Sequence, residues 1–280
     1  MDKLKGIDIQ VLSRAIKSAK PFVKLTALWQ FLNTEYGIGC IDKNNLIINH
    51  SDYQHIRELI QSEMNLDLLE PLPVGSRIDI ARKTGDEKLN AEAPGRHHIL
   101  LNSPSGHLLV NGLSIPLMIG ASYRLDWRML DEFPQSIIVV ENLQVFDFFQ
   151  SVMLPEFLFE SLVVYRGHNI SSRAVIDFLQ ATPQNTDIIA FCDYDPKGLE
   201  IAFTTTKASH ILLPELEQAF NGAEGTRQRF DKQHAAIIHV SQRPLPSGLG
   251  THWKKLMDKK MCVSQELILA HSKLLEVFPL

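Results

Sequence analysis

Three acidic residues follow two apolar runs in the second half of the chain, and their types and spacing suit a bound cation. Glu141 comes directly after the run Ile137–Val140, and Asp193 and Asp195 come after the run Ile188–Cys192. In an extended segment, residues two positions apart point to the same face of the chain. Mg²⁺ takes oxygen ligands in proteins, commonly one or two carboxylates together with phosphates of a substrate. The three acids therefore predict a site for a divalent cation.

The apolar runs are expected to form the buried strands that position these acids. Strand candidates lie at residues 136–140, 162–165, 187–192 and 234–240, and helical segments follow the first three. Strands that alternate with helices predict an α/β fold with a parallel sheet and right-handed crossovers. Sheets of this class bind ligands outside the carboxyl ends of their strands. We therefore expect the three acids to meet at one edge of one sheet.

Several of the candidate residues also have a purely structural interpretation. Asp195 precedes a proline that favours the first turn of a helix, so it could serve only as an N-cap. Glu266 could be a further metal ligand or an acid that stabilises the first turn of a helix. Arg166 and His168 lie in a loop before an expected helix start, where phosphate groups bind favourably, and Lys197 lies in a similar place. These three side chains could equally be solvated surface groups.

The motifs around the acids resemble those of the Toprim domain, which occurs in primases, topoisomerases and some nucleases. The Toprim pattern is a Glu after a first strand and Asp-x-Asp after a later one, which Glu141, Asp193 and Asp195 match. The fuller set looks most like the JetD family, the nucleases of Wadjet plasmid-defence systems, which is related to the A subunit of topoisomerase VI. It consists of Val140-Glu141-Asn142 with Phe146, Tyr165-Arg166-Gly167-His168, Asp193-Tyr194-Asp195-Pro196-Lys197-Gly198 and, more weakly, Val263-Ser264-Gln265-Glu266. The resemblance covers roughly residues 133–280.

This resemblance implies a DNA endonuclease that depends on Mg²⁺ or Mn²⁺ and hydrolyses phosphodiester bonds in plasmid or phage defence. The implied metal ligands are Glu141, Asp193, Asp195 and Glu266, and the implied catalytic residues are Glu141, Asp193, Asp195 and His168. The residues implied to contact DNA are Arg166, His168 and Lys197. The implied partners are DNA and the subunits of an SMC-type, condensin-like complex that delivers it, and a homodimer is a further open arrangement.

Two other functions stay open from the sequence. A non-catalytic DNA-binding or assembly subunit would use a Toprim fold as a scaffold. A subunit like the topoisomerase VI A subunit would need a nucleophilic tyrosine before the Toprim domain, and Tyr123 is the only tyrosine in residues 76–132. The surrounding sequence, YRLDWR, does not match the motif of that family well.

The chain before residue 133 is expected to form two smaller parts. Residues 1–75 are predicted to be a winged-helix-like α+β domain, and residues 76–132 a linker followed by a β-hairpin around Ser103–Gly106. In the first part, a helix is expected within residues 22–35, a short strand at residues 46–48, and a helix that a capping box of Ser51 and Gln54 begins. The remaining residues, 133–280, would be the Toprim-like domain, with residues 266–278 as its last helix.

The composition is that of an ordinary globular protein and limits the partners. The 280 residues carry a formal net charge of −4, from 32 acidic and 28 basic residues, whereas a nucleic-acid binder usually has a basic excess. This argues against tight, free-standing DNA binding but not against a nuclease that a partner loads onto DNA. The three cysteines have no metal-ligand spacing. No apolar run reaches the ~20 residues of a membrane span, and the first residues lack a signal peptide, so we expect a cytoplasmic protein.

Overall fold

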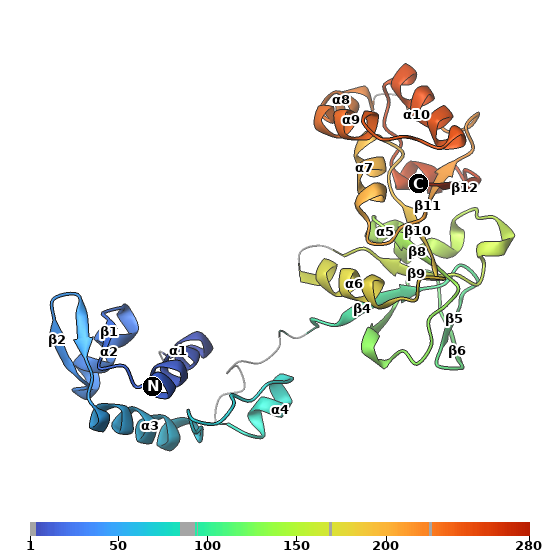
Figure 1. Ribbon diagram of the computed structural model, residues 1–280. Helices are drawn as coiled ribbons and strands as arrows, with labels where there is room; N and C mark the ends of the chain where they lie inside the picture. Colours follow the sequence, from blue (N-terminus) through green and yellow to red (C-terminus); the bar gives the residue numbers. More distant parts are fainter. Residues whose placement is uncertain (1–3, 85–92, 94, 168–169, 224–225) are drawn as a thin grey trace. The chain divides into compact units, whose positions relative to one another are not determined.

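The computed structural model describes residues 4–84, 93, 95–167, 170–223 and 226–280. The chain forms two compact units, Met1–Pro94 and Gly95–Leu280, which are drawn in Figure 1. Each unit has hydrophobic clusters of its own, one in the first unit and two in the second. No helix within the described ranges is both long and apolar enough to cross a membrane.

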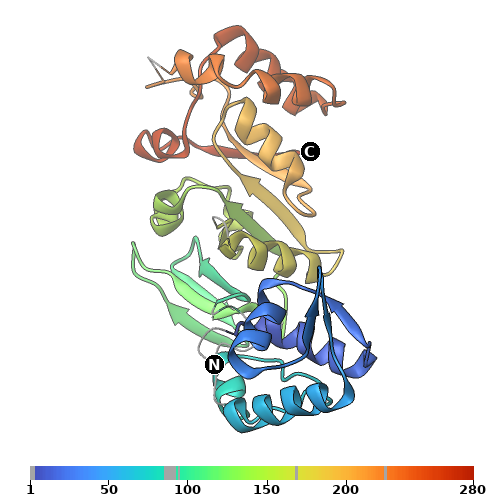
Figure 2. The same ribbon diagram turned by 90° about the vertical axis from the view of Figure 1, so that its left-hand side faces the viewer.

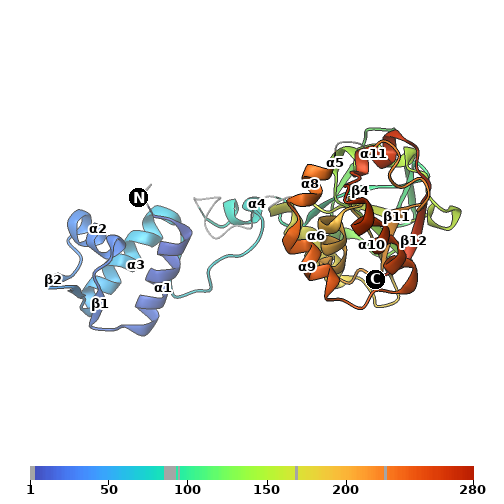
Figure 3. The ribbon, with the colours of Figure 1, turned by 90° about the horizontal axis from the view of Figure 1, so that it is seen from above.

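The first unit is a mixed α+β unit built on a three-stranded antiparallel sheet of order β1-β3-β2. Figure 3 shows helices α1, α2 and α3 beside the labelled strands β1 and β2. Its elements are α1 (Gly6–Ser18), β1 (Phe22–Lys24), α2 (Ala27–Tyr36), β2 (Cys40–Asp42), β3 (Asn45–Ile47), α3 (His50–Met64) and α4 (Arg77–Ala81). Trp29 and Leu32 on α2, Leu46 on β3 and Ile56 on α3 share one buried cluster. The helix predicted in residues 22–35 is confirmed from Ala27 onward, whereas Phe22–Lys24 form strand β1 instead, and the strand predicted at residues 46–48 is confirmed as β3 with its bounds one residue earlier. The β2–β3 hairpin, rather than a tight turn, joins α2 to α3.

Helix α3 begins earlier than the expected capping box. Asn49 is the N-cap: its side chain accepts a hydrogen bond from the Asp52 backbone N–H, and the Asp52 carboxylate accepts one from the Asn49 backbone N–H, both at 2.9 Å. Ser51 lies inside the helix and donates to Asn49 Oδ1 at 2.6 Å. The prediction that Ser51 and Gln54 cap the helix was wrong, because Asn is as good an N-cap as Ser and Asp52 supplies the reciprocal acceptor.

The second unit is an α/β unit whose seven-stranded sheet has the order β12-β11-β10-β8-β9-β4-β7. Its strands are β4 (His98–Asn102), β7 (Tyr123–Asp126), β8 (Ser136–Val140), β9 (Leu162–Tyr165), β10 (Asp187–Phe191), β11 (His210–Pro214) and β12 (Leu275–Pro279). Most of them are labelled in Figure 1, and Figure 2 shows the same unit from another side. The four middle strands, from β11 to β9, run parallel. Strands β12 and β4 run antiparallel to their neighbours, so the sheet is mixed rather than wholly parallel. The expected α/β class is confirmed.

Helices cover both faces of this sheet because successive residues of a strand point to opposite faces. On β8, Ile138 and Val140 belong to one buried cluster, while Ile137 and Val139 belong to the other. The first cluster includes side chains of α5 (Leu143–Asp147) and α7 (Pro196–Thr204), and the second includes side chains of α6 (Ile170–Ala181). Strands that are buried on both faces read as continuous apolar runs, which is how β8 and β10 were recognisable in the sequence.

The helices between β11 and β12 differ from the expectation. The unit contains α8 (Arg227–Asp231), α9 (His234–Ser241), α10 (Ser247–Lys259) and α11 (Gln265–Ala270) there, and Figure 1 shows α8, α9 and α10 grouped together. The prediction of a strand at residues 234–240 was wrong, because a short apolar run can be a buried helix as well as a strand. The next parallel strand is β11. Residues 266–278 are not one helix either: α11 ends at Ala270, Ser272 takes a left-handed φ of 46°, and β12 follows.

The region predicted as linker and hairpin contributes two strands to the main sheet. Strand β4 pairs with β7 and β9, whereas β5 (His107–Val110) pairs with β6 (Leu113–Pro116). The predicted hairpin around Ser103–Gly106 was therefore wrong. The hairpin turn is Asn111-Gly112, where φ is 49° and 75°, as a two-residue turn of the favoured hairpin type requires. This Asn-Gly pair is the sequence signal that identifies the turn.

Candidate cation-binding site

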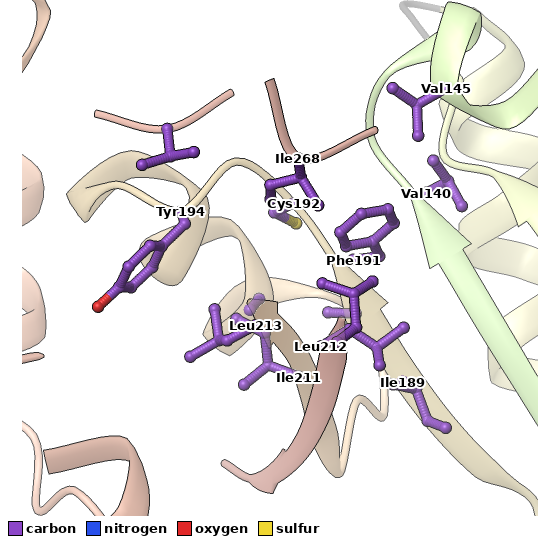
Figure 4. Close-up of a cluster of buried hydrophobic side chains, with 14 of the residues drawn as sticks. Val140, Val145, Ile189, Phe191, Cys192, Tyr194, Ile211, Leu212, Leu213 and Ile268 are labelled. Atoms are coloured by element: carbon purple, nitrogen blue, oxygen red, sulfur yellow. The ribbon is translucent and has the colours of Figure 1, made fainter. Parts of the chain in front are cut away.

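The carboxyl ends of β8 and β10 lie side by side, and the three predicted acids follow them. Val140 is paired with Phe191 in parallel register. The Glu141 backbone N–H donates to the Phe191 carbonyl at 3.1 Å, which continues the ladder one step past the strands. Glu141 and Asp193 therefore begin their loops at the same edge of the sheet. Below this edge, Val140, Ile189 and Phe191 pack in the cluster that Figure 4 shows.

Asp193 lies in surroundings that disfavour its charged form. The pKa of its carboxyl group is raised to about 7, mainly by burial and also by the nearby acids Asp195, Glu141 and Glu266, while a hydrogen bond from the Gln265 backbone acts in the opposite direction. That bond runs from Gln265 N to Asp193 Oδ1 at 2.8 Å. A carboxylate that is buried among like charges gains most from a bound cation.

Glu141 is also partly buried, and Arg166 is its charged neighbour. Burial raises the pKa of Glu141, while the Arg166 guanidinium acts in the opposite direction. Arg166 Nη2 lies 3.7 Å from Glu141 Oε1. The other oxygen, Glu141 Oε2, is buried and has no hydrogen-bond partner of normal geometry among the residues that the structure describes, although the Asp193 backbone and the Cys192 thiol lie near enough to lower the pKa of Glu141. An orphaned buried carboxylate oxygen is a site where a cation would be favoured.

Asp195 is the N-cap of α7. Its Oδ1 accepts a hydrogen bond from Gly198 N and its Oδ2 accepts one from Gln233 Nε2, both at 2.7 Å. The side chain is 5% exposed. The capping interpretation therefore describes the structure, but it does not exclude a ligand role, because each carboxylate oxygen has two lone pairs.

Gly198 explains why this loop is so tight. A Cβ atom at Gly198 would lie 1.9 Å from the Asp193 carbonyl oxygen. Only glycine lets the first turn of α7 approach the Asp193 backbone this closely. The spacing of the Asp-Tyr-Asp-Pro-Lys-Gly motif therefore follows from backbone packing at the end of β10 as well as from its acids.

Helix α11 adds two residues to the edge, Gln265 and Glu266. Asn142 Nδ2 donates to Glu266 Oε1 at 2.6 Å, and Asn142 N donates to Gln265 Oε1 at 2.8 Å. Burial would raise the pKa of Glu266, but hydrogen bonds from its own backbone, Ser264 and Asn142 outweigh it and lower the pKa. Glu266 thus stays a carboxylate within reach of the β8 loop.

The amide side chains at this edge were not among the predicted site residues. Gln233 donates to Asp195 and accepts a hydrogen bond from Lys197 N at 2.8 Å. Asn142 and Gln265 lie inside the sequence motifs, directly beside the predicted acids Glu141 and Glu266. Gln233 stands in no motif, and only the fold brings it to Asp195.

The other predicted site residues are the four that the sequence offered for DNA contacts or as a nucleophile: Arg166, His168, Lys197 and Tyr123. The Lys197 ammonium pairs with Glu200 along α7, and Arg166 pairs with Glu141. His168 lies outside the described residues. Tyr123 begins β7, which is three strands away from β8 in the sheet order, and it packs against an apolar cluster. The structure therefore does not bring Tyr123 to the three acids.

The geometry and chemistry of the edge fit a hard cation in part. Within the ranges that the structure describes, no three His, Cys, Asp or Glu side chains are arranged to surround an ion. Asp193 and Asp195 instead accept hydrogen bonds from N–H groups. The donor set is nevertheless all oxygen, with the orphaned Glu141 Oε2 and the half-buried Asp193, as Mg²⁺ or Mn²⁺ requires. Glu141, Asp193, Asp195 and Glu266 are the residues that could hold one.

The chain matches a protein family over nearly all of its second unit. The model of a family described as a domain of unknown function (DUF7281) matches residues 96–277, well over half of the chain and including every residue of this edge. A search of curated proteins found no match.

Proposed function

The chain belongs to the DUF7281 domain family, and we propose that it is a metal-dependent DNA endonuclease with a Toprim-type site. The observation that carries the proposal is the parallel register of β8 and β10, which brings Glu141 and Asp193 to one sheet edge. The Toprim pattern requires this juxtaposition of a Glu with an Asp-x-Asp pair. The burial of Asp193 among other acids supports a cation as the missing counter-charge.

The residues at the carboxyl ends of β8 and β10 would have different roles in phosphodiester hydrolysis. A bound Mg²⁺ or Mn²⁺ would polarise the scissile phosphate and stabilise the charge that develops on it. Glu141, whose pKa is raised by burial, is the candidate to accept a proton from the attacking water. Arg166 can exchange its contact with Glu141 for a phosphate oxygen, since guanidinium groups bind phosphate well. Glu141, Asp193, Asp195 and Glu266 would hold the cation, and His168 and Lys197 are further candidates for DNA contacts.

The proposed partners follow from the resemblance and from charge. The net charge of −4 supports a nuclease that other subunits load onto DNA, and an SMC-type, condensin-like complex is the proposed loader. The first unit, which we propose to be winged-helix-like, would contact DNA or these subunits. The biological role would be defence against plasmids or phages.

A plasmid-nicking assay with Mg²⁺ or Mn²⁺, with and without the proposed partner subunits, tests this function. We expect nicking by the unaltered protein and at least a hundredfold loss in Asp193→Asn. Asp187→Asn is the matched control, because Asp187 is an exposed acid at the other end of the same strand. Nicking that persists in Asp193→Asn, or no nicking by the unaltered protein in any arm, would contradict the proposal.

A non-catalytic DNA-binding or assembly subunit is the second candidate. The specific observation in its favour is that both oxygens of Asp195 already accept hydrogen bonds from N–H groups. Such a subunit would bind DNA or its partners equally well with and without Asp193→Asn, and it would show no Mn²⁺ binding by calorimetry. A tyrosine-linked DNA adduct that Tyr123→Phe abolishes would instead indicate a topoisomerase-like subunit.

A further inference from the structure

Gln265 connects the two strand ends that carry the acids. The residue is fully buried. Its side-chain Nε2 donates to the Phe191 carbonyl at 3.1 Å, at the end of β10. Its Oε1 accepts a hydrogen bond from Asn142 N at 2.8 Å, just past the end of β8. One amide group thus joins both neighbouring strands.

The backbone of Gln265 also holds one of the acids directly. Gln265 N donates to Asp193 Oδ1 at 2.8 Å, although the two residues are 72 positions apart in the sequence. The same residue therefore fixes the main chain beside Glu141, through Asn142, and the side chain of Asp193. The acids themselves cannot supply this restraint, because like charges repel one another.

The segment that carries Gln265 is itself held at the edge. Tyr194 and Val263 form a backbone bridge, with N–H···O distances of 2.8 and 3.1 Å. Ser264 caps α11 through the Leu267 backbone N–H. The Tyr194 hydroxyl donates to the His252 carbonyl at 2.9 Å. These contacts hold in place the segment from which the Gln265 side chain reaches the ends of β8 and β10.

An amide is the side chain that this position requires. The Phe191 carbonyl accepts a second donor beside the Glu141 N–H, and the Asn142 N–H needs an acceptor, and a Gln side chain offers one of each. A Glu side chain would set a second oxygen against the Phe191 carbonyl, and a Met side chain would fill the volume without either hydrogen bond.

We propose that Gln265 is a positioning residue that holds Glu141 and Asp193 at the separation in which they share a cation. This inference rests on the proposed function, since it assigns Gln265 a part in the same site. Residues that orient metal ligands commonly change metal affinity by about 10- to 100-fold when they are mutated. Gln265 would act in the same way by joining the strands rather than by touching the cation.

The test is Mn²⁺ binding by calorimetry to the full chain carrying Gln265→Met. We expect the Kd to rise at least about tenfold. The matched control is Asn102→Leu, because Asn102 is equally buried and its side chain also joins two backbone groups, Phe146 O and Ser103 N, both at 2.8 Å. It lies on β4, two strands from β8 in the sheet order, and we expect its Mn²⁺ Kd to stay within about twofold of the unaltered value.

A readout without metal tests the connection itself. In Gln265→Met, the Asn142 amide loses its acceptor, so its hydrogen exchange should accelerate at least about tenfold, while Asn102→Leu should leave it unchanged. Equal Mn²⁺ affinity in Gln265→Met and the unaltered protein, or an equal loss in Asn102→Leu, would overturn the inference and leave the proposed function standing. If the unaltered protein bound no Mn²⁺, the proposed function and the positioning role would both fail, whereas the exchange result would still decide whether Gln265 joins the strands.

Discussion

Asp193 is a residue of the candidate site whose ionised side chain lowers the stability of the folded protein. Its carboxyl group is largely buried, and its neighbours are acids. In the folded protein its pKa of about 7 lies well above the ordinary value of 3.8. The folded state therefore binds a proton more strongly than the unfolded state does. Without a cation, the ionised Asp193 destabilises the fold, as functional groups often do.

We expect Asp193→Asn to stabilise the metal-free protein at alkaline pH. Because the pKa of Asp193 is raised in the folded state, the free energy of unfolding falls as pH rises from about 4 to about 7 and Asp193 loses its proton. An Asn side chain does not ionise, so the variant does not lose this stability. The variant should exceed the unaltered protein by on the order of 2–4 kcal/mol at pH 8 and by little at pH 4. Thermal melts of both proteins at these two pH values check this. Mn²⁺ should then raise the melting temperature of the unaltered protein only, and a variant that is less stable at pH 8 would identify Asp193 as a structural residue.

The contribution of His252 to stability depends on pH in the opposite direction to that of Asp193. It is 3% exposed and lies between Tyr194 and Phe278, with ring centroids 5.5 and 4.6 Å away. Burial lowers its pKa from 6.5 to about 4. The neutral ring is therefore favoured in the folded state, and its contribution is complete above pH 6.5 and is lost as pH falls toward 4. The opposite effects of Asp193 and His252 on the pH dependence of stability partly cancel in the unaltered protein, so variants are needed to separate them.

We expect His252→Phe to reduce the loss of stability between pH 6.5 and pH 4. Phe keeps a ring between Tyr194 and Phe278 and cannot bind a proton. Denaturant midpoints at the two pH values measure the effect, and the exposed His234→Gln on α9 is the control. If both variants lost as much stability on acidification as the unaltered protein, the buried neutral state of His252 would be refuted.

At the scale of elements, the sequence predicted the strands beneath the site better than the segments around it. Strands β8, β9 and β10 are β-rich apolar runs that end in polar residues, so both their type and their carboxyl ends were recognisable. Residues 234–240, HAAIIHV, are also a largely apolar run, but the periodicity of so short a stretch does not separate a strand from a helix. The antiparallel β12 and the bridging Gln265 depend on contacts between distant segments, which no local pattern records.

The contact between α7 and the end of β10 leads to a prediction at this scale. Gly198→Ala should destabilise the protein by about 1–3 kcal/mol, because the new Cβ would lie 1.9 Å from the Asp193 carbonyl oxygen and either the helix or the loop must move. Gly250→Ala is the control, since this helical glycine on α10 has no atom nearer than 3.9 Å to an added Cβ. That change should be neutral or stabilising by about 0.5–1 kcal/mol. Urea titrations measure both, and equal effects of the two changes would show that α7 does not pack this tightly.

At the scale of the whole molecule, the chain consists of two units with separate hydrophobic clusters. The seven-stranded sheet and the candidate site belong entirely to the second unit, within the part that the DUF7281 family model matches. A cation bound at the site therefore adds its binding free energy to the folding of the second unit.

We expect Mn²⁺ to stabilise the second unit alone, and the three tryptophans allow this to be measured. Trp29 is buried in the cluster of the first unit, whereas Trp127 and Trp253 pack against the clusters of the second. In Trp29→Phe, fluorescence reports the second unit, and its unfolding midpoint should rise with Mn²⁺ concentration as binding to the folded state requires.

The complementary variant carries Trp127→Phe and Trp253→Phe, so that only Trp29 reports. Its unfolding midpoint should not change with Mn²⁺, because the metal has no ligands in the first unit under this proposal. Adding Asp193→Asn to Trp29→Phe should abolish the shift there as well, which ties the effect to the site rather than to general salt. A Mn²⁺-dependent shift of the Trp29 signal would mean that the two units unfold together or that the ion binds elsewhere, and the assignment of the site to the second unit alone would then be wrong.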